Sequence, residues 1–136
     1  MQLGIRLHDI KKAPLEERLA IAKEQGFLCG HLALSKVITE YPVNVIFISN
    51  FFHFFTKTSF IFKKIFAKND LDIAVLGCYL NLANPDEGQL AKITHRYLAH
   101  IRFASLLGVG VVGTETGAVN EAYKFEEKNH SDEALD

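Results

Sequence analysis

The sequence predicts an α/β fold with a parallel sheet whose strands are joined by crossover helices. Strand-like and helix-like segments alternate along the chain, which is the pattern that βαβ units produce. Residues 72–80 form a nearly continuous apolar run, as expected for a strand buried on both faces. The Asn-Pro-Asp-Glu sequence at 84–87 then predicts a helix start, with Asn84 as the cap, a proline at the first position and acids against the helix dipole.

The first two strands and the helix between them follow from residue alternation and from helix-terminating residues. In residues 3–8 apolar side chains alternate with polar or small ones, which places Arg6 and His8 on the same face. A helix is predicted from Pro14, which is favoured in a first helical turn, to Gly26, which can adopt the left-handed conformation that ends a helix. Residues 29–34 form the second predicted strand.

The second half of the chain repeats this organisation. The helix that starts at 84–87 is expected to end at Gly108, and it is followed by a fourth strand at 109–114 and a polar loop at 117–129. We predict that residues 71–114 form a strand-helix-strand unit with parallel strands and a right-handed crossover. The last six residues, 131–136, resemble a helix cap and a first turn, so we expect the chain to be the front part of a larger α/β enzyme.

The segment 44–62 does not fit the alternation. It holds seven of the eleven phenylalanines, and residues 45–55 show neither a clean helical period nor strict alternation. Its polar interruptions disfavour a membrane span, which needs about twenty apolar residues. A partner-binding or membrane-surface hairpin is one alternative, but our interpretation is a replaced or misread stretch with ordinary flanks.

Composition limits the possible classes of protein. A chain of 136 residues, 49% apolar and with a net charge of −1, can bury one sizeable core without a second domain. Near neutrality disfavours a nucleic-acid partner, which would require a basic patch. The N-terminus lacks the apolar run of a secretory signal, so a cytoplasmic location is expected. Cys29 and Cys78 are expected to be buried, reduced thiols.

Three groups of residues resemble the xylose isomerase-like TIM barrels. These groups are Gly26-Phe27 before the second strand, Asn-Leu-Ala-Asn-Pro-Asp-Glu at 81–87, and Ala-Ser-Leu-Leu-Gly at 104–108 followed by Val-Val-Gly-Thr-Glu-Thr-Gly at 111–117. The family includes sugar phosphate isomerases and epimerases and the barrel-type apurinic endonucleases. The resemblance covers most of the chain outside 39–62, and it implies that residues 1–136 form the N-terminal part of the barrel, a partial (β/α)8 fold with strands one to four.

The resemblance also implies a reaction and a cofactor for the intact form. The reaction would be metal-assisted proton transfer on a ketose or aldose, so the partner would be a small sugar or sugar phosphate. The divalent metal, Mn, Mg, Co or Zn, would be held by carboxylates and histidine on later strands, and none is expected for this chain alone. We therefore expect the chain to be inactive by itself and to supply the substrate-side wall.

Five polar residues are candidates for substrate binding, because active sites of parallel barrels form at the C-terminal strand ends. These residues are Arg6, His8, His31, Asn81 and Glu115. We predict that His8, His31 and Glu115 converge at one end of the sheet. In the resembling family the position of His31 often carries an acid, so this histidine is a departure that suits substrate contact rather than metal ligation.

Each candidate also has a purely structural alternative. Arg6 could fill the barrel core through a buried ion pair, His8 could merely end its strand, and His31 could be a satisfied core histidine. Glu115 could bind the amides of the loop that follows it, and Asn81 could satisfy the start of the next helix. His95 and His100 lie five residues apart on one predicted helix, on different faces, and are expected at the surface.

A function of a different class is also open. An open half-barrel exposes unpaired strand edges, so the chain could be a non-catalytic protein that forms homo-oligomers through these edges. A degenerate gene product without a stable fold is a further alternative.

Overall fold

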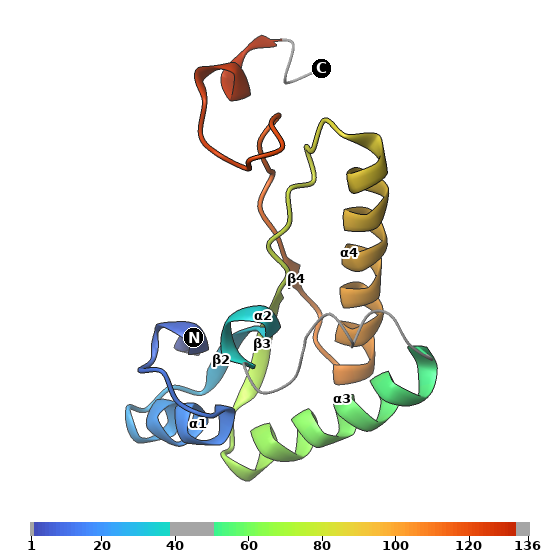
Figure 1. Cartoon of the computed structure of the whole chain (residues 1–136). Helices are drawn as coiled ribbons and strands as arrows, with labels where there is room; N and C mark the ends of the chain where they lie inside the picture. Colours follow the sequence, from blue (N-terminus) through green and yellow to red (C-terminus); the bar gives the residue numbers. More distant parts are fainter. Residues whose placement is uncertain (1, 39–50, 133–136) are drawn as a thin grey trace.

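Four parallel strands, joined by helices, make up the sheet in the computed structural model, which describes residues 2–38 and 51–132 (Figure 1). The elements in chain order are β1 (Gly4–Arg6), the 3-10 turn η1 (Leu7–Asp9), α1 (Leu15–Glu24), β2 (Cys29–Ala33), α2 (Leu34–Val37), α3 (Phe51–Lys68), β3 (Asp72–Gly77), α4 (Glu87–Leu107), β4 (Val112–Gly113) and the 3-10 turn η3 (Glu127–His130). The predicted α/β class is confirmed. The predicted features that fall on 39–50 and 133–136 lie outside the described residues.

The strands follow one another across the sheet in chain order, β1-β2-β3-β4, and every neighbouring pair is parallel. Arg6 is paired with His31 in the register of β1 and β2, which brings these two candidate residues side by side. A register shift between Gly30 and His31 marks an irregularity where β2 pairs with β3. The parallel pairing of β3 with β4 confirms that part of the prediction for residues 71–114.

The strands are shorter than predicted. β1 ends at Arg6, because the chain turns into η1 at Leu7, so His8 lies in a turn beyond the strand. β3 ends at Gly77 and not at Leu80. Its first residues alternate between exposed and half-buried, and full burial begins only near its C-terminal end. The expectation that this strand is buried on both faces along its length was wrong, because the helices cover one side of the sheet.

The predicted helix ends are close to the observed ones. Gly26 and Gly108 have φ angles of +83° and +79°, the left-handed conformation in which glycine ends a helix without steric cost. Pro14 is the residue before α1 and not its first helical residue. The cap of α4 is Asp86, whose side chain accepts a hydrogen bond from the Gln89 amide. Asn84, the predicted cap, instead accepts a hydrogen bond from the amide of Asp86, which lies two residues later in the chain.

The Phe-rich segment is helical wherever the structure describes it. Residues 51–62 form the greater part of α3, although the sequence shows no clean helical period over 45–55. Ser59, Phe62 and Phe66 are buried at helical spacing, while Phe60 is exposed. The earlier residues, 44–50, lie outside the described part. Among the described helices, none combines the length and the apolar character that crossing a membrane requires.

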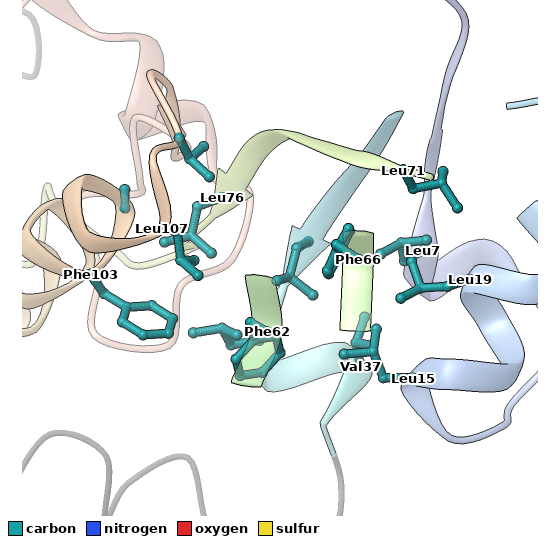
Figure 2. Close-up of a cluster of buried hydrophobic side chains, with 14 of the residues drawn as sticks. Leu7, Leu15, Leu19, Val37, Phe62, Phe66, Leu71, Leu76, Phe103 and Leu107 are labelled. Carbon is teal, nitrogen blue, oxygen red and sulfur yellow. The ribbon is translucent and has the colours of Figure 1, made fainter. Parts of the chain in front are cut away.

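One hydrophobic core joins the helices to one face of the sheet (Figure 2). It contains Leu15 and Leu19 of α1, Phe62 and Phe66 of α3, Phe103 and Leu107 of α4, and Leu32 and Leu76 of the neighbouring strands β2 and β3. The rings of Phe62 and Phe103 meet edge to face with centroids 6.1 Å apart, which ties α3 to α4. The helices therefore gather on one side of the sheet, and His31 and Gly77 face the other side.

Candidate functional site

A group of polar side chains lies where β1, β2 and β3 end. It consists of Arg6 at the end of β1, His8 in η1, His31 in β2, Lys36 in α2 and Tyr79 just after β3. We call these five residues the edge cluster. Because the three strands are parallel neighbours, their C-terminal ends meet at one edge of the sheet.

The two histidines and the tyrosine contact one another. The rings of His8 and His31 are 5.5 Å apart in an edge-to-face arrangement. The Tyr79 hydroxyl lies 3.0 Å from Nε2 of His31, which is hydrogen-bond distance. The ammonium group of Lys36 lies 4.6 Å from the centre of the Tyr79 ring, in a cation-π contact. The predicted proximity of His8 and His31 is thus observed.

Arg6 favours one tautomer of neutral His8. Its Nη2 and Nε atoms lie 2.9 and 3.2 Å from Nε2 of His8. A guanidinium can only donate, so Nε2 accepts and a neutral His8 carries its proton on Nδ1. That Nδ1 atom is buried and has no hydrogen-bond partner among the described residues. Arg6 itself pairs with Asp9 at 3.3 Å and is 57% exposed, so the alternative of a buried ion pair in the core was wrong.

Gly77 provides the space in which His31 lies. A Cβ atom at Gly77 would fall 2.3 Å from Nε2 of His31 and 3.2 Å from the Tyr79 ring. Any side chain at this position would displace the imidazole from its hydrogen bond with Tyr79. The absence of a side chain at the end of β3 is therefore part of the site.

Both imidazoles of the edge cluster favour the neutral form. Burial lowers the pKa of His8, and the adjacent Arg6 guanidinium lowers it further. Burial also lowers the pKa of His31, and His8 and Arg6 act in the same direction. At neutral pH the cluster thus presents two uncharged imidazoles and a phenol between two cationic side chains.

A buried arginine that no sequence pattern indicates, Arg18, holds the turn that carries His8. Arg18 of α1 donates from Nη1 to the carbonyl oxygens of Leu7 and Ile10, and from Nε to that of Ala13. Its position on an otherwise ordinary helix gives no sequence signal. Tyr79 could have been predicted, because it lies two residues after Gly77 and alternation along the strand therefore places it on the same face as Gly77, opposite Leu76.

Asn81 is buried, and it binds a later loop instead of the start of α4. Its Oδ1 accepts from the Ala118 amide at 2.8 Å, and its Nδ2 donates to the Asn120 carbonyl at 3.0 Å. The proposed role at the helix start was therefore wrong. The segments after β3 and β4 consequently run side by side beyond the sheet (Figure 1).

Glu115 lies in the segment after β4, where its carboxylate accepts a hydrogen bond from the Tyr123 hydroxyl. This bond raises the pKa of Tyr123 to about 12. None of the described contacts joins Glu115 to the two histidines. The alternative in which Glu115 binds a loop is closer to the observed structure, although its partner is a side chain and not an amide.

The edge cluster does not fit a divalent metal. Nε2 of His8 already accepts from Arg6, and Nε2 of His31 shares a hydrogen bond with Tyr79. The positive charges of Arg6 and Lys36 would also repel a cation. Within residues 2–38 and 51–132, no three histidine, cysteine or acidic side chains are grouped as metal ligands would be.

Four residues outside the edge cluster, Cys29, Cys78, His95 and His100, were also considered in the sequence. Cys29 and Cys78 are free and buried, as predicted, and burial raises the pKa of Cys78 to about 11. His95 is exposed, as expected. His100 is buried and lies 2.9 Å from the Arg96 carbonyl, so its expected surface position was wrong.

A search of protein-family models finds no match for the chain, and a search of curated proteins finds none either. What the edge cluster can bind therefore has to be inferred from its chemistry. Imidazole and phenol groups bind hydroxyls by donating and accepting hydrogen bonds, and guanidinium and ammonium groups favour oxygen ligands with negative charge.

Proposed function

We propose that the chain forms the substrate-binding wall of a sugar or sugar phosphate isomerase or epimerase built on a TIM-barrel-like fold. The observation that carries this proposal is the meeting of His8, His31 and Tyr79 at the C-terminal ends of three adjacent parallel strands. In TIM-barrel enzymes this edge holds the active site. Arg6 and His8, together with His31, are the proposed substrate contacts.

The arrangement of sheet and helices supports a barrel-like architecture. The strand order is sequential, and α1, α3 and α4 share a single core on one face of the sheet. Doubly wound folds place helices on both faces, whereas a barrel places them outside and leaves the inner face to side chains. His31 and Gly77 lie on the face that would point inward.

The chemistry of the cluster suits a polyol. Imidazole and phenol groups exchange hydrogen bonds with hydroxyls, so a sugar hydroxyl can replace the bond between His31 and Tyr79 or the bond between Arg6 and His8. Arg6 can hold a hydroxyl or a phosphate oxygen. Because the cluster does not fit a metal, the proposal assigns these residues substrate binding and derives no proton-transfer step from them.

A titration followed by the histidine ring signals in NMR would test sugar binding. An aldose, a ketose and their phosphate esters are added in turn to the full chain. We expect the His8 and His31 signals to shift with at least one ligand, while those of the exposed His95 stay in place. If no sugar or sugar phosphate shifts the two signals at millimolar concentration, the proposed function is wrong.

Two glycine variants supply the matched comparison. Gly77→Ala should weaken binding by about tenfold or more, because its Cβ fills the place of the His31 ring and removes an oriented contact. Gly110→Ala should bind normally, since no described atom lies within 4 Å of its Cβ. Equal binding by both variants would show that His31 is not a contact.

A second candidate, a non-catalytic chain that self-associates, is favoured by the sheet edges. The outermost strands of the described sheet, β1 and β4, have three and two residues. Leu3 and Val111, which adjoin them, are 62% and 53% exposed. Assembly without sugar binding would support this candidate over the first.

A further inference from the structure

The edge cluster has a cation at each end and neutral rings between them. Lys36 lies over the Tyr79 ring at 4.6 Å, and Tyr79 reaches His31 at 3.0 Å. The His31 ring faces His8 at 5.5 Å, and His8 accepts from Arg6 at 2.9 Å. The chain of contacts is therefore continuous from one positive charge to the other.

The buried Nδ1–H of His8 is a donor without an acceptor. The His8 side chain is only 8% exposed, and its Nδ1 has no partner among the described residues. A buried donor that lacks an acceptor is costly, and an oxygen ligand would relieve this cost if the side chains around Nδ1 move apart to admit it. The Nδ1–H group of His8 favours a hydrogen-bond acceptor, and the positive charges of Arg6 and Lys36 favour a ligand with negative charge.

We propose that the edge cluster binds an oxyanion and that the His8–His31 pair takes up one proton from the solvent when the anion binds. The inference rests on the proposed function, because it assigns a negative charge to the ligand of the same site. An anion stabilises an imidazolium beside it, so the pair can hold the proton that it cannot hold alone. No covalent bond forms or breaks in this step.

The charges that face the pair support this coupling. Arg6 of β1 and Lys36 of α2 oppose protonation of both histidines, and Arg18 of α1 adds a smaller effect at His8. Asp9 in η1 acts in the opposite direction, and it also pairs with Arg6. Together with burial, these groups keep the pair neutral when no anion is present, so that an anion changes its protonation.

Calorimetric titration of the full chain would test the coupling. The probes are sulfate as a tetrahedral oxyanion and acetate as a planar one, since neither gains a proton near about pH 7. Each titration is repeated in two buffers with different heats of ionisation, which gives the number of protons taken up. We expect uptake with at least one probe, and the probe that binds identifies a phosphate-like or a carboxylate-like ligand group.

Three charge variants locate the site. Lys36→Gln should weaken anion binding about three- to tenfold, as expected for a partly screened unit charge. Lys64→Gln is the matched control, because Lys64 also lies over an aromatic ring, that of Phe60, but in α3 outside the cluster. Asp9→Asn should tighten binding, because it removes the carboxylate that competes for Arg6. These three side chains are exposed, so the fold should survive each change.

Several results would overturn the inference. Binding of neither probe, binding without proton uptake, or equal weakening by Lys36→Gln and Lys64→Gln would each do so. A neutral ketose provides the separate arm for the proposed function. If the ketose shifts the His8 and His31 signals while neither anion binds, sugar binding is supported and the oxyanion inference is wrong. If an anion binds with proton uptake while no sugar shifts the signals, the oxyanion inference is supported and sugar binding is wrong.

Discussion

At the scale of single residues, Arg18 shows how a buried charge positions the site. Arg18 is 4% exposed, and its three hydrogen bonds to backbone carbonyls span the connection from Leu7 to Ala13. Hydrogen bonds that involve a charged group are stronger than neutral ones, and carbonyls left without donors would destabilise the turn. Arg18 thereby holds η1 and, with it, the imidazole of His8.

His100 should make the protein sensitive to acid. Burial lowers its pKa below the ordinary value of 6.5, so the folded state resists protonation more than the unfolded state does. The stability contributed by neutral His100 is therefore complete above about pH 6.5, and it is lost as the pH falls through the lowered pKa of the folded state.

Urea unfolding at several pH values would measure this effect. We expect the wild-type protein to lose more stability than His100→Gln as the pH falls from about 7 to about 5, since glutamine does not titrate. His95→Gln is the control on the same helix, and it should follow the wild type because His95 is exposed. Identical acid dependence in His100→Gln and wild type would contradict the prediction.

The sequence predicted the two histidines of the site but not the residues that complete it. The alternation of apolar and polar residues indicated His8 and His31, because the face on which a strand residue lies can be predicted from its neighbours in the sequence. Lys36 reaches Tyr79 only because the chain turns into α2, and Arg18 reaches Leu7 only because α1 packs against η1. The spacing of residues in the sequence does not predict such contacts. Glu115 was expected beside the histidines. The segment after β4 instead lies along the segment that contains Asn81, and Glu115 binds Tyr123.

At the scale of elements, α3 is a packed part of the fold. Phe62 and Phe66 enter the same core as Leu76 of β3, and Phe62 meets Phe103 of α4 (Figure 2). The opposite face of α3 carries lysines and exposed apolar side chains such as Phe60. Phe60 is exposed whereas Phe62 and Phe66 are buried, so phenylalanine alone does not mark the buried face of this helix in the sequence.

Two phenylalanine variants of α3 should differ sharply in stability. Phe62→Ala should lower the free energy of unfolding by about 3–5 kcal/mol, because it leaves a cavity beneath Phe103. Phe60→Ala should change it by less than about 0.5 kcal/mol, since Phe60 is 58% exposed. Chemical denaturation followed by circular dichroism checks both values. Equal losses would mean that α3 does not dock as described.

Helix ends were better predicted than strand ends for a physical reason. Gly26 and Gly108 adopt a conformation that other residues rarely do, so a glycine after a helical pattern is a strong stop signal. Strand ends depend on where the partner strand ends. The apolar run continues past Gly77, but β4 pairs only with residues up to that point.

At the scale of the whole molecule, the helices gather on one side of the sheet, and β1 and β4 are its outer strands among the described residues. The helices share one core against Leu32 and Leu76, while His31 and Gly77, on the other face, are not part of that core. The outer strands β1 and β4 present backbone groups that further strands or another chain could pair. The four-strand sheet is thus suited to extension in either direction.

The last prediction concerns association through these edges. We expect sedimentation of the purified chain to show an average mass that rises with concentration, because unpaired strand edges next to exposed apolar side chains favour pairing between copies. Leu3→Lys and Val111→Lys place a charge beside β1 and β4, and each should shift the association to roughly tenfold higher concentration. Ile101→Lys on the exposed face of α4 is the control, and it should associate like the wild type. A monomer at every concentration would show that the edges are protected, and it would remove the support for a self-associating protein.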